Sequence, residues 1–207
     1  MRVNTNHWNK LRYTFYTPVY DWVGKIFGSS RKKAIADLNL KDGEKILLVG
    51  AGTGLDLEYI PKECVVTATD ITPSMVQRIK HRNNSLKLQL DARIMDGQKL
   101  EFPDNYFDKA ILHLILAVIP DPVTCLCEAE RVLKPGGKIS VFDKFVPANH
   151  KLSLIRRLLN PVTNLLFSDI TRSFEPIVAQ TGLRIISDLP ADFRGNFRIL
   201  LLEKPLI

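Results

Sequence analysis

The residues best suited to bind a ligand follow a short apolar run in the first half of the chain. Residues 46–54 read ILLVGAGTG, in which a strand pattern runs directly into a glycine-rich turn that opens a helix. Gly50, Gly52 and Gly54 permit positive φ and carry no side chain, so backbone N–H groups can approach a polar or anionic ligand. A dinucleotide fingerprint needs G-x-G-x-x-G, but its third glycine is replaced here by Leu55. The spacing argues against a pyrophosphate cradle, and such a turn alone can also be purely structural.

Two acidic residues follow at the ends of the next two predicted strands. Asp70 ends the second strand, where an ionised carboxylate can accept hydrogen bonds from both hydroxyls of a ribose. Asp96 stands beside the small Gly97 after the third strand, where it can accept a bond from the exocyclic amine of a purine. Each acid alone is more often a loop residue or a helix N-cap. Together with the glycine-rich turn, they predict a nucleoside site at the carboxyl edge of one parallel sheet.

Short β-branched runs alternate with helical patterns from Lys45 onward, which predicts repeated βα units and a mainly parallel sheet. Gly182 fits a helix stop, and Pro135–Gly137 fits a tight turn into the next strand. Because only residues 190–196 separate the last two strands, we expect these two to form an antiparallel hairpin. The predicted strands are residues 45–49, 65–70, 86–93, 107–113, 138–145, 183–189 and 197–203, and the helical patterns are residues 55–60, 73–83, 123–132 and 173–181.

Residues 1–33 differ from the rest, with seven basic residues against one acidic residue and many aromatics. Thr17 and Pro18 predict a break into two short helices, with Gly28 ending the second. A second basic amphipathic stretch, Lys151–Phe167, is interrupted at Pro161. The N-terminal apolar residues share one helical face at three- and four-residue spacings: Trp8, Leu11, Phe15, Val19, Trp22 and Ile26.

The composition narrows the class of protein further. With 207 residues, 45% apolar and 25% charged, the chain has the make-up of one folded domain and not of a disordered or low-complexity protein. Three cysteines are too few for a disulfide scaffold, which predicts a reduced intracellular protein without structural zinc. The net charge of +7 favours phosphate-bearing partners, although a solvated basic surface with no partner gives the same balance.

Four motifs in a fixed order extend these observations to a known family. They read LLVGAGTGLDL, TATDITPSMV, MDGQKLEFPDNYFDKAI and RVLKPGGKISV, within residues 35–145. The set resembles that of class I S-adenosylmethionine-dependent methyltransferases. The resemblance implies S-adenosylmethionine as cofactor and an α/β Rossmann-like fold, with a seven-stranded, mainly parallel sheet, an antiparallel last strand and three αβα layers. It also implies a helical lid at residues 1–33 and a methyltransferase domain at residues 34–207, with residues 150–172 inserted over the active site.

The same resemblance assigns roles to individual residues. His113 is the candidate catalytic residue, because it could accept the proton of an amine acceptor; the alternative is a packed or helix-capping histidine. Many family members carry an acid at the position of Leu48, so the methionine ammonium is either held by backbone carbonyls and water or bound less tightly. No metal is expected. The implied cofactor-binding residues are Gly50, Ala51 and Gly52 with Gly54 at the methionyl part, Asp70 at the ribose, Ile71 against the adenine, Asp96 and Gly97 at the adenine edge, and His113 and Leu114 near the methyl group.

The acceptor must be recognised outside these motifs. The segments YTPVYDW, GTGLDL and LAVIPDP look most similar to small bacterial phosphatidylethanolamine N-methyltransferases, and next to quinone C-methyltransferases. The resemblance implies a small or lipid-like acceptor such as a phospholipid amine, with a quinone or other small molecule as the alternative. It also leads us to expect a cytoplasmic protein in peripheral contact with the inner membrane face through its basic amphipathic helices, which could instead close as a lid on a soluble substrate.

Two further functions stay open on the sequence. The basic charge would suit an RNA methyltransferase, but the N/D-P-P-Y/F tetrapeptide of base amino-methylation is absent, so nucleic acid is not the expected partner. A non-catalytic S-adenosylmethionine-binding protein is the other alternative, and Leu48 is the feature that favours it.

Overall fold

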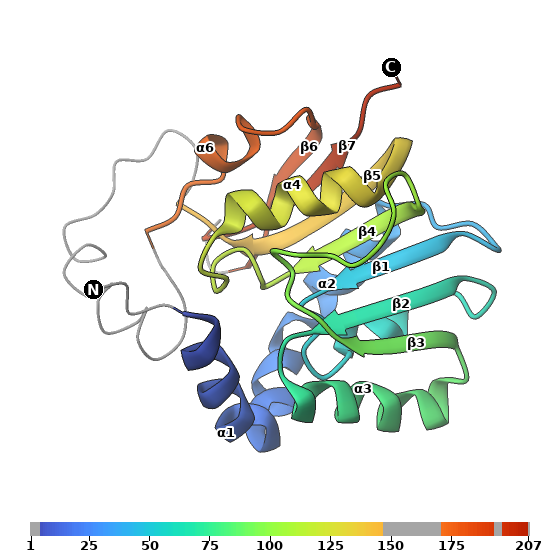
Figure 1. The fold of residues 1–207 in the computed structure, drawn as a ribbon, viewed down its shortest axis with the longest axis vertical. Coiled ribbons are helices and arrows are strands. Elements are labelled where there is room, and N and C mark those ends of the chain that lie inside the picture. The colour runs from blue at the N-terminus through green and yellow to red at the C-terminus, as the bar shows by residue number, and fades with distance from the viewer. Residues whose placement is uncertain (1–4, 147–170, 193–195, 207) are drawn as a thin grey trace.

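The computed structural model describes residues 5–146, 171–192 and 196–206, and it contains a seven-stranded sheet in the order β3-β2-β1-β4-β5-β7-β6 (Figure 1). The pairs among β1 to β5 are parallel, whereas β7 is antiparallel to both of its neighbours. The predicted Rossmann-like sheet with a reversed last strand is confirmed. The strands are β1 Lys45–Val49, β2 Val65–Asp70, β3 Gln89–Ile94, β4 Phe107–His113, β5 Leu133–Lys144, β6 Arg184–Pro190 and β7 Phe197–Glu203.

Helices cover both faces of the sheet and give it three layers. The helical segments are α1 Asn6–Gly24, η1 Lys25–Phe27, α2 Gly28–Ala36, η2 Leu55–Tyr59, α3 Pro73–Leu86, α4 Pro122–Val132 and α6 Glu175–Val178. Alternate residues of β1 explain why both faces are apolar. Leu47 and Val49 belong to a core with α4 and α6, while Ile46 and Leu48 belong to a second core with α2, η2 and α3.

The N-terminal segment departs from the prediction. α1 continues through Thr17 and Pro18 to Gly24, so these residues do not divide it into two helices. Proline removes one helical hydrogen bond and crowds the preceding turn, which kinks a helix without always ending it. Gly28 has φ −59° and ψ −42° and is therefore helical: it caps the end of η1, but it is also the first residue of α2, so the helical path continues through it. The predicted lid boundary after residue 33 therefore falls inside α2.

Smaller differences concern element ends. α3 continues to Leu86, so β3 begins at Gln89 and not at residue 86. Pro135–Gly137 lies inside β5, where it forms an irregularity in the pairing with β4, and Gly136 has φ +74°. The predicted helix before Gly182 shortens to α6, and the Gly182 N–H donates to a Glu130 carboxylate oxygen at 3.0 Å. The candidate insertion Lys151–Phe167 lies outside the described residues.

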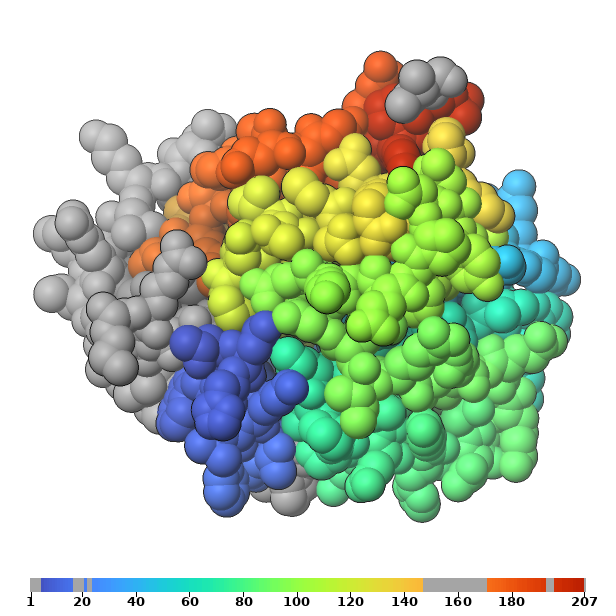
Figure 2. All heavy atoms as spheres, viewed as in Figure 1, coloured from blue at the N-terminus to red at the C-terminus, as the bar shows by residue number. Residues whose placement is uncertain are grey.

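α1 lies on the side of the sheet to which β1, β2 and β3 point (Figure 1). Its atoms abut those of the segments that follow β2 and β3 (Figure 2). Consistent with this, Asn6 of α1 donates a hydrogen bond to Asp96, and Asp21 of α1 accepts one from Arg82 of α3. α1 is therefore placed to form a wall of any site at the carboxyl edge of the sheet. Among the helices formed by the described residues, none combines the length and the apolar character that a bilayer span requires.

A buried polar network joins α2, η2, β4 and β5 beneath this edge. Arg31 donates to Asp56 at 2.5 Å, and Asp56 contacts His113 Nδ1 at 2.8 Å. His113 Nε2 lies 3.0 Å from Ser140 Oγ, which donates to the Ala34 carbonyl. Burial opposes ionisation of Asp56, but Arg31 and His113 hold the pKa of its carboxyl well below the usual range. The network thus fixes α2 to the sheet through a buried charge pair.

Replacement of Asp56 by alanine is expected to lower the free energy of unfolding by about 3–5 kcal/mol, because Arg31 keeps a buried charge without its carboxylate. Urea denaturation at pH 7 measures the change. In the unsubstituted chain, the Asp56 contribution is full above the ordinary carboxyl pKa of 3.8 and is lost as the pH falls through the lower folded-state value.

Asp91→Ala provides the control, because the Asp91–Arg93 pair is about half exposed and is expected to contribute less than about 1 kcal/mol. Equal decreases in the free energy of unfolding of the two variants would show that the buried Arg31–Asp56 pair stabilises the fold no more than the exposed Asp91–Arg93 pair does.

Candidate functional site

The glycine-rich turn after β1 has the conformation that its sequence predicts. Gly50, Gly52 and Gly54 have φ of +65°, +58° and +81°, which strongly favours glycine at these positions. A Cβ atom at Gly50 would also lie 2.5 Å from the Ile115 side chain. The turn therefore brings bare backbone to the carboxyl end of β1, next to the loop that follows β4.

Asp70 ties this turn to the tip of β2. Its carboxylate accepts from the Gly52 N–H at 2.9 Å and from the Thr72 N–H at 2.8 Å. Burial raises the pKa of Asp70 to about 6, although the two backbone donors favour the charged form. An ionised carboxylate has about four lone-pair sites, so Asp70 can still accept hydrogen bonds from a ligand.

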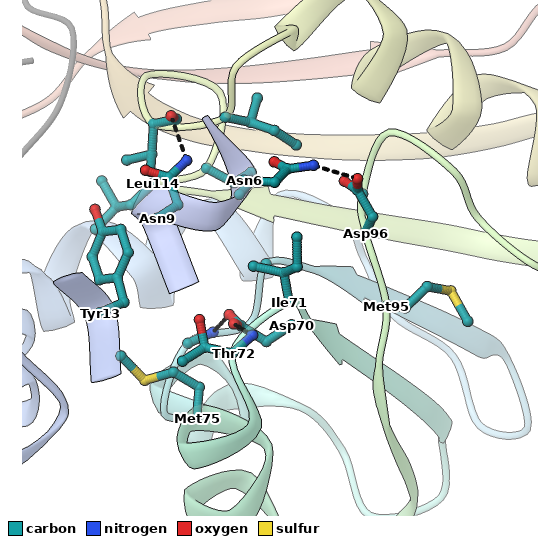
Figure 3. A pocket seen from close by; sticks show the side chains of 16 residues that line it. Asn6, Asn9, Tyr13, Asp70, Ile71, Thr72, Met75, Met95, Asp96 and Leu114 are labelled. Atoms are coloured by element: carbon teal, nitrogen blue, oxygen red, sulfur yellow. Dashed lines mark hydrogen bonds between the residues drawn. The ribbon is translucent and has the colours of Figure 1, made fainter. Parts of the chain in front are cut away.

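Asp96 occupies the corresponding position after β3 and already has two amide neighbours. The Asn6 side-chain amide donates to Asp96 at 2.5 Å (Figure 3). The Gln98 backbone N–H also donates to Asp96, at 2.9 Å. The Gln98 side-chain amide lies 3.1 Å from the same carboxylate and 3.2 Å from the Asn6 carbonyl oxygen. Gly97 packs closely, since a Cβ there would lie 2.7 Å from Val49 Cγ1. Asp96 therefore faces the pocket as part of a network that reaches α1.

A pocket with about 600 Å³ of atom-free space, partly open to solvent, lies between these elements (Figure 3). Of the predicted residues, Gly50, Gly52, Asp70, Ile71, Asp96, Gly97 and Leu114 line the pocket; the others that line it are Asn6, Asn9, Tyr13, Thr72, Met75, Met95, Ile115, Val118 and Ile119.

Three predicted residues are not among those that line the pocket. Ala51 and Gly54 belong to the turn, and the Ala51 N–H donates to the Thr69 carbonyl at 2.9 Å. His113 is only 4% exposed, and its two ring nitrogens contact Asp56 and Ser140. This position corresponds to the packed-histidine alternative and gives no support to a role as catalytic base. Leu48 is buried in the second core, so its side chain serves packing.

Leu114 differs from its neighbour His113, because it lines the pocket in a strained conformation. Its φ is +58°, and its N–H donates to the Phe142 carbonyl at 2.7 Å. Such backbone strain at a bulky residue is uncommon and is often found at functional sites. The loop from Leu114 to Ile119 thus forms a pocket wall beside the glycine-rich turn.

Three of the nine pocket residues that sequence reasoning missed lie on α1. Asn6, Asn9 and Tyr13 follow one another at three- and four-residue spacings, which places them on one helical face. The Asn9 amide donates to the Val118 carbonyl at 3.4 Å. The signal in the sequence was this polar stripe, which lies beside the apolar one. Across the described ranges, no three His, Cys, Asp or Glu side chains are grouped so that they could hold a metal ion.

The family model and two relatives that match this chain are all described as methyltransferases. Residues 47–141 match the family model described as a methyltransferase domain. Phosphatidylethanolamine N-methyltransferase of Cereibacter sphaeroides is 28% identical over 189 residues, which cover 90% of this chain and 93% of that protein. Demethylmenaquinone methyltransferase of Tropheryma whipplei is 34% identical over 145 residues and 67% of this chain, but the match spans only 59% of that protein.

A solved structure shares the fold at low sequence identity. Haemonchus contortus phospholethanolamine N-methyltransferase 2, in complex with phosphomonomethylethanolamine and S-adenosylhomocysteine, superposes with a TM-score of 0.73 at 16% identity. The match covers 92% of this chain and 57% of that one. Together with the motifs and the pocket, these comparisons narrow the range of reactions that the pocket at this edge of the sheet could catalyse.

The pKa of Asp70 leads to a prediction about pH. Because ribose hydroxyls need an acceptor, the affinity for S-adenosylhomocysteine is expected to fall by up to about tenfold per pH unit below about pH 6, where Asp70 becomes protonated. Isothermal titration calorimetry between pH 5 and pH 8 measures this dependence. Asp70→Asn is expected to bind more weakly at pH 7 and to lose the slope, and a slope that persists in this variant would assign the titration to another group.

Proposed function

The chain belongs to the class I S-adenosylmethionine-dependent methyltransferases, and on this basis we propose that it methylates the amine of a phospholipid headgroup at the pocket formed by the carboxyl ends of β1 to β4. The observation that carries this proposal is the match of 189 residues to the phosphatidylethanolamine N-methyltransferase. A match of this length must extend beyond residues 35–145, where the cofactor motifs lie, and so includes part of the chain that would select an acceptor.

The pocket residues fit the cofactor in their chemistry. We infer that Asp70 accepts the ribose hydroxyls and that Asp96, beside Gly97, accepts the adenine amine. Ile71 supplies an apolar surface for the adenine ring. The backbone of residues 50–54 would border the methionyl part, with Gly50 and Gly52 in the pocket and Ala51 and Gly54 in the supporting turn.

The bound cofactor supplies an electrophilic methyl group on a sulfonium. Methyl transfer to an amine is an in-line displacement, so the protein mainly has to align the acceptor and exclude water. Leu114, Ile115 and Val118 form an apolar wall of the pocket, and this wall can limit access of water. A general base is not obligatory, provided that the amine arrives unprotonated, which agrees with the engagement of both His113 nitrogens elsewhere.

An apolar surface on α1 favours an acceptor in a membrane. Leu11 is 45% exposed and Phe15 is 74% exposed, and the four-residue spacing places them on one face. Lys10, which precedes Leu11 in α1, and Lys25, which begins η1, are exposed as well. Apolar side chains bordered by lysines are typical of helices that lie at an anionic lipid surface. Since Asn6, Asn9 and Tyr13 of the same helix line the pocket, a lipid headgroup bound at α1 would lie close to the cofactor.

A quinone acceptor is the second candidate, and the relative of Tropheryma whipplei favours it. Incubation with S-adenosylmethionine labelled at the methyl group distinguishes the candidates when vesicles containing phosphatidylethanolamine, a demethylated quinone and transfer RNA are offered separately. We expect label in the phosphatidylethanolamine fraction. Label in the quinone or RNA alone would refute the lipid-amine proposal, and cofactor binding without labelled product in any fraction would indicate a non-catalytic protein.

The α1 surface generates a separate prediction. Leu11→Ala together with Phe15→Ala is expected to lower partition onto vesicles containing phosphatidylethanolamine and an anionic lipid by about tenfold or more, because the exposed apolar area on α1 is removed. Vesicle co-sedimentation measures the partition, and the affinity for S-adenosylhomocysteine is expected to stay unchanged.

Ile94→Ala on β3 is the matched control for this experiment, because Ile94 is 56% exposed but lies on the edge strand. An equal loss of vesicle binding in the control variant would argue against a specific role for α1.

A further inference from the structure

Two side chains, Asp21 and Arg82, contact the glycine-rich turn on the side away from the pocket. Neither of them lines the pocket. Thr53 is 1% exposed and stands between Gly52 and Gly54. Its hydroxyl donates to the Asp21 carboxylate of α1, and its carbonyl accepts from Arg82 Nε of α3 at 3.0 Å. α1 and α3 therefore both contact the glycine-rich turn at Thr53.

Asp21 and Arg82 also contact each other. Arg82 Nη2 lies 2.7 Å from Asp21 Oδ2, and the two side chains are 16% and 27% exposed. Hydrogen bonds between charged groups in such partly buried places are stronger than those between neutral groups. Asp21, Thr53 and Arg82 thus form a closed triangle, in which each member contacts the other two.

The turn needs such support because of its conformation. Three positive φ values occur within five residues, and glycine gives the free chain many alternatives to this arrangement. From the pocket side, Asp70 accepts the Gly52 N–H. From the outer side, the contacts to Thr53 oppose any displacement of the turn away from the pocket. A turn that is already ordered does not have to lose conformational entropy when a ligand binds.

α1 connects this support to the other end of the pocket. Its first residue, Asn6, contacts Asp96, while Asp21 contacts Thr53 near its last turn. One helix therefore contacts both the adenine side of the pocket and the glycine-rich turn. A displacement of α1 would disturb both contacts together.

We propose that Asp21 and Arg82 are positioning residues, which hold the glycine-rich turn in its cofactor-binding conformation through the Thr53 hydroxyl and carbonyl. The inference rests on the proposed cofactor role of this turn. It concerns residues that do not line the pocket, and it makes the N-terminal helix a component of the cofactor site.

The test measures S-adenosylmethionine affinity by calorimetry in variants of the triangle. Asp21→Ala, Thr53→Val and Arg82→Met are each expected to raise the Kd by about tenfold, a modest effect for the loss of a charge-assisted hydrogen bond. Because the three residues act as a unit, Asp21→Ala combined with Arg82→Met is expected to raise the Kd little more than either change alone. Arg82→Lys keeps the charge but removes the Nε donor, so it is expected to restore only part of the affinity.

Glu58→Gln is the matched control. Glu58 accepts from Arg82 Nη1 at an exposed position and does not belong to the triangle, so the Kd of this variant is expected to stay within about twofold of the original. Thermal unfolding of each variant, measured without ligand, identifies the fraction that is folded at the calorimetry temperature. Asp21→Asn serves as the milder substitution if the alanine variant is not folded.

The outcomes separate this inference from the proposed function. If Asp70→Ala abolishes binding while the triangle variants fold and bind like the control, the turn is a cofactor site but Asp21 and Arg82 do not position it. If neither Asp70→Ala nor the triangle variants change the Kd, the turn is not the cofactor site. A rise in Kd for the triangle variants at unchanged folded fraction supports the inference, whereas a lower melting temperature alone, at unchanged Kd, assigns the triangle to stability and overturns it.

Discussion

The Asp70 carboxylate is the interaction on which the candidate site depends. It accepts the Gly52 N–H and the Thr72 N–H, and so joins the turn after β1 to the tip of β2. Its burial has a cost, visible in a pKa raised to about 6, and the two backbone donors offset part of that cost. A carboxylate held in this way is fixed in orientation before any ligand arrives. The geometry of the site is therefore set by strand order and backbone, and it does not rely on flexible side chains adjusting to the ligand.

The site is completed by an element that is remote in sequence. α1 supplies Asn6, Asn9 and Tyr13 to the pocket wall, and it presents Leu11 and Phe15 to solvent on another part of its surface. A single rigid helix can therefore contact a cofactor on one side and an apolar acceptor phase on another. This arrangement explains how a water-soluble cofactor and an apolar acceptor could meet at one pocket. The sheet alone does not provide such an apolar surface beside the pocket.

The sequence predicted the elements whose signals are local. The apolar strand pattern and the turn glycines located β1 and its loop, and once the parallel order was recognised, Asp70 and Asp96 had to meet at one edge. The sequence did not predict features that depend on contacts between residues far apart in the chain. Pro18 lies within a continuous helix whose two ends are bound to Asp96 and to Arg82, contacts that no local pattern reveals. His113 was predicted near the methyl group because of its strand end. Its partner Asp56 is 57 residues away, so its buried place in a charge network could not be read from spacing.

The contacts of α1 also bear on how the chain reaches its native state. Asn6 pairs with a residue 90 positions later and Asn9 with one 109 positions later, so the helix leaves the ribosome long before its partners exist. Pairings of such separation close large loops and form late in folding. During synthesis this amphipathic segment is consequently accessible to a chaperone or a lipid surface. The pocket is completed by α1 only after most of the sheet has been translated.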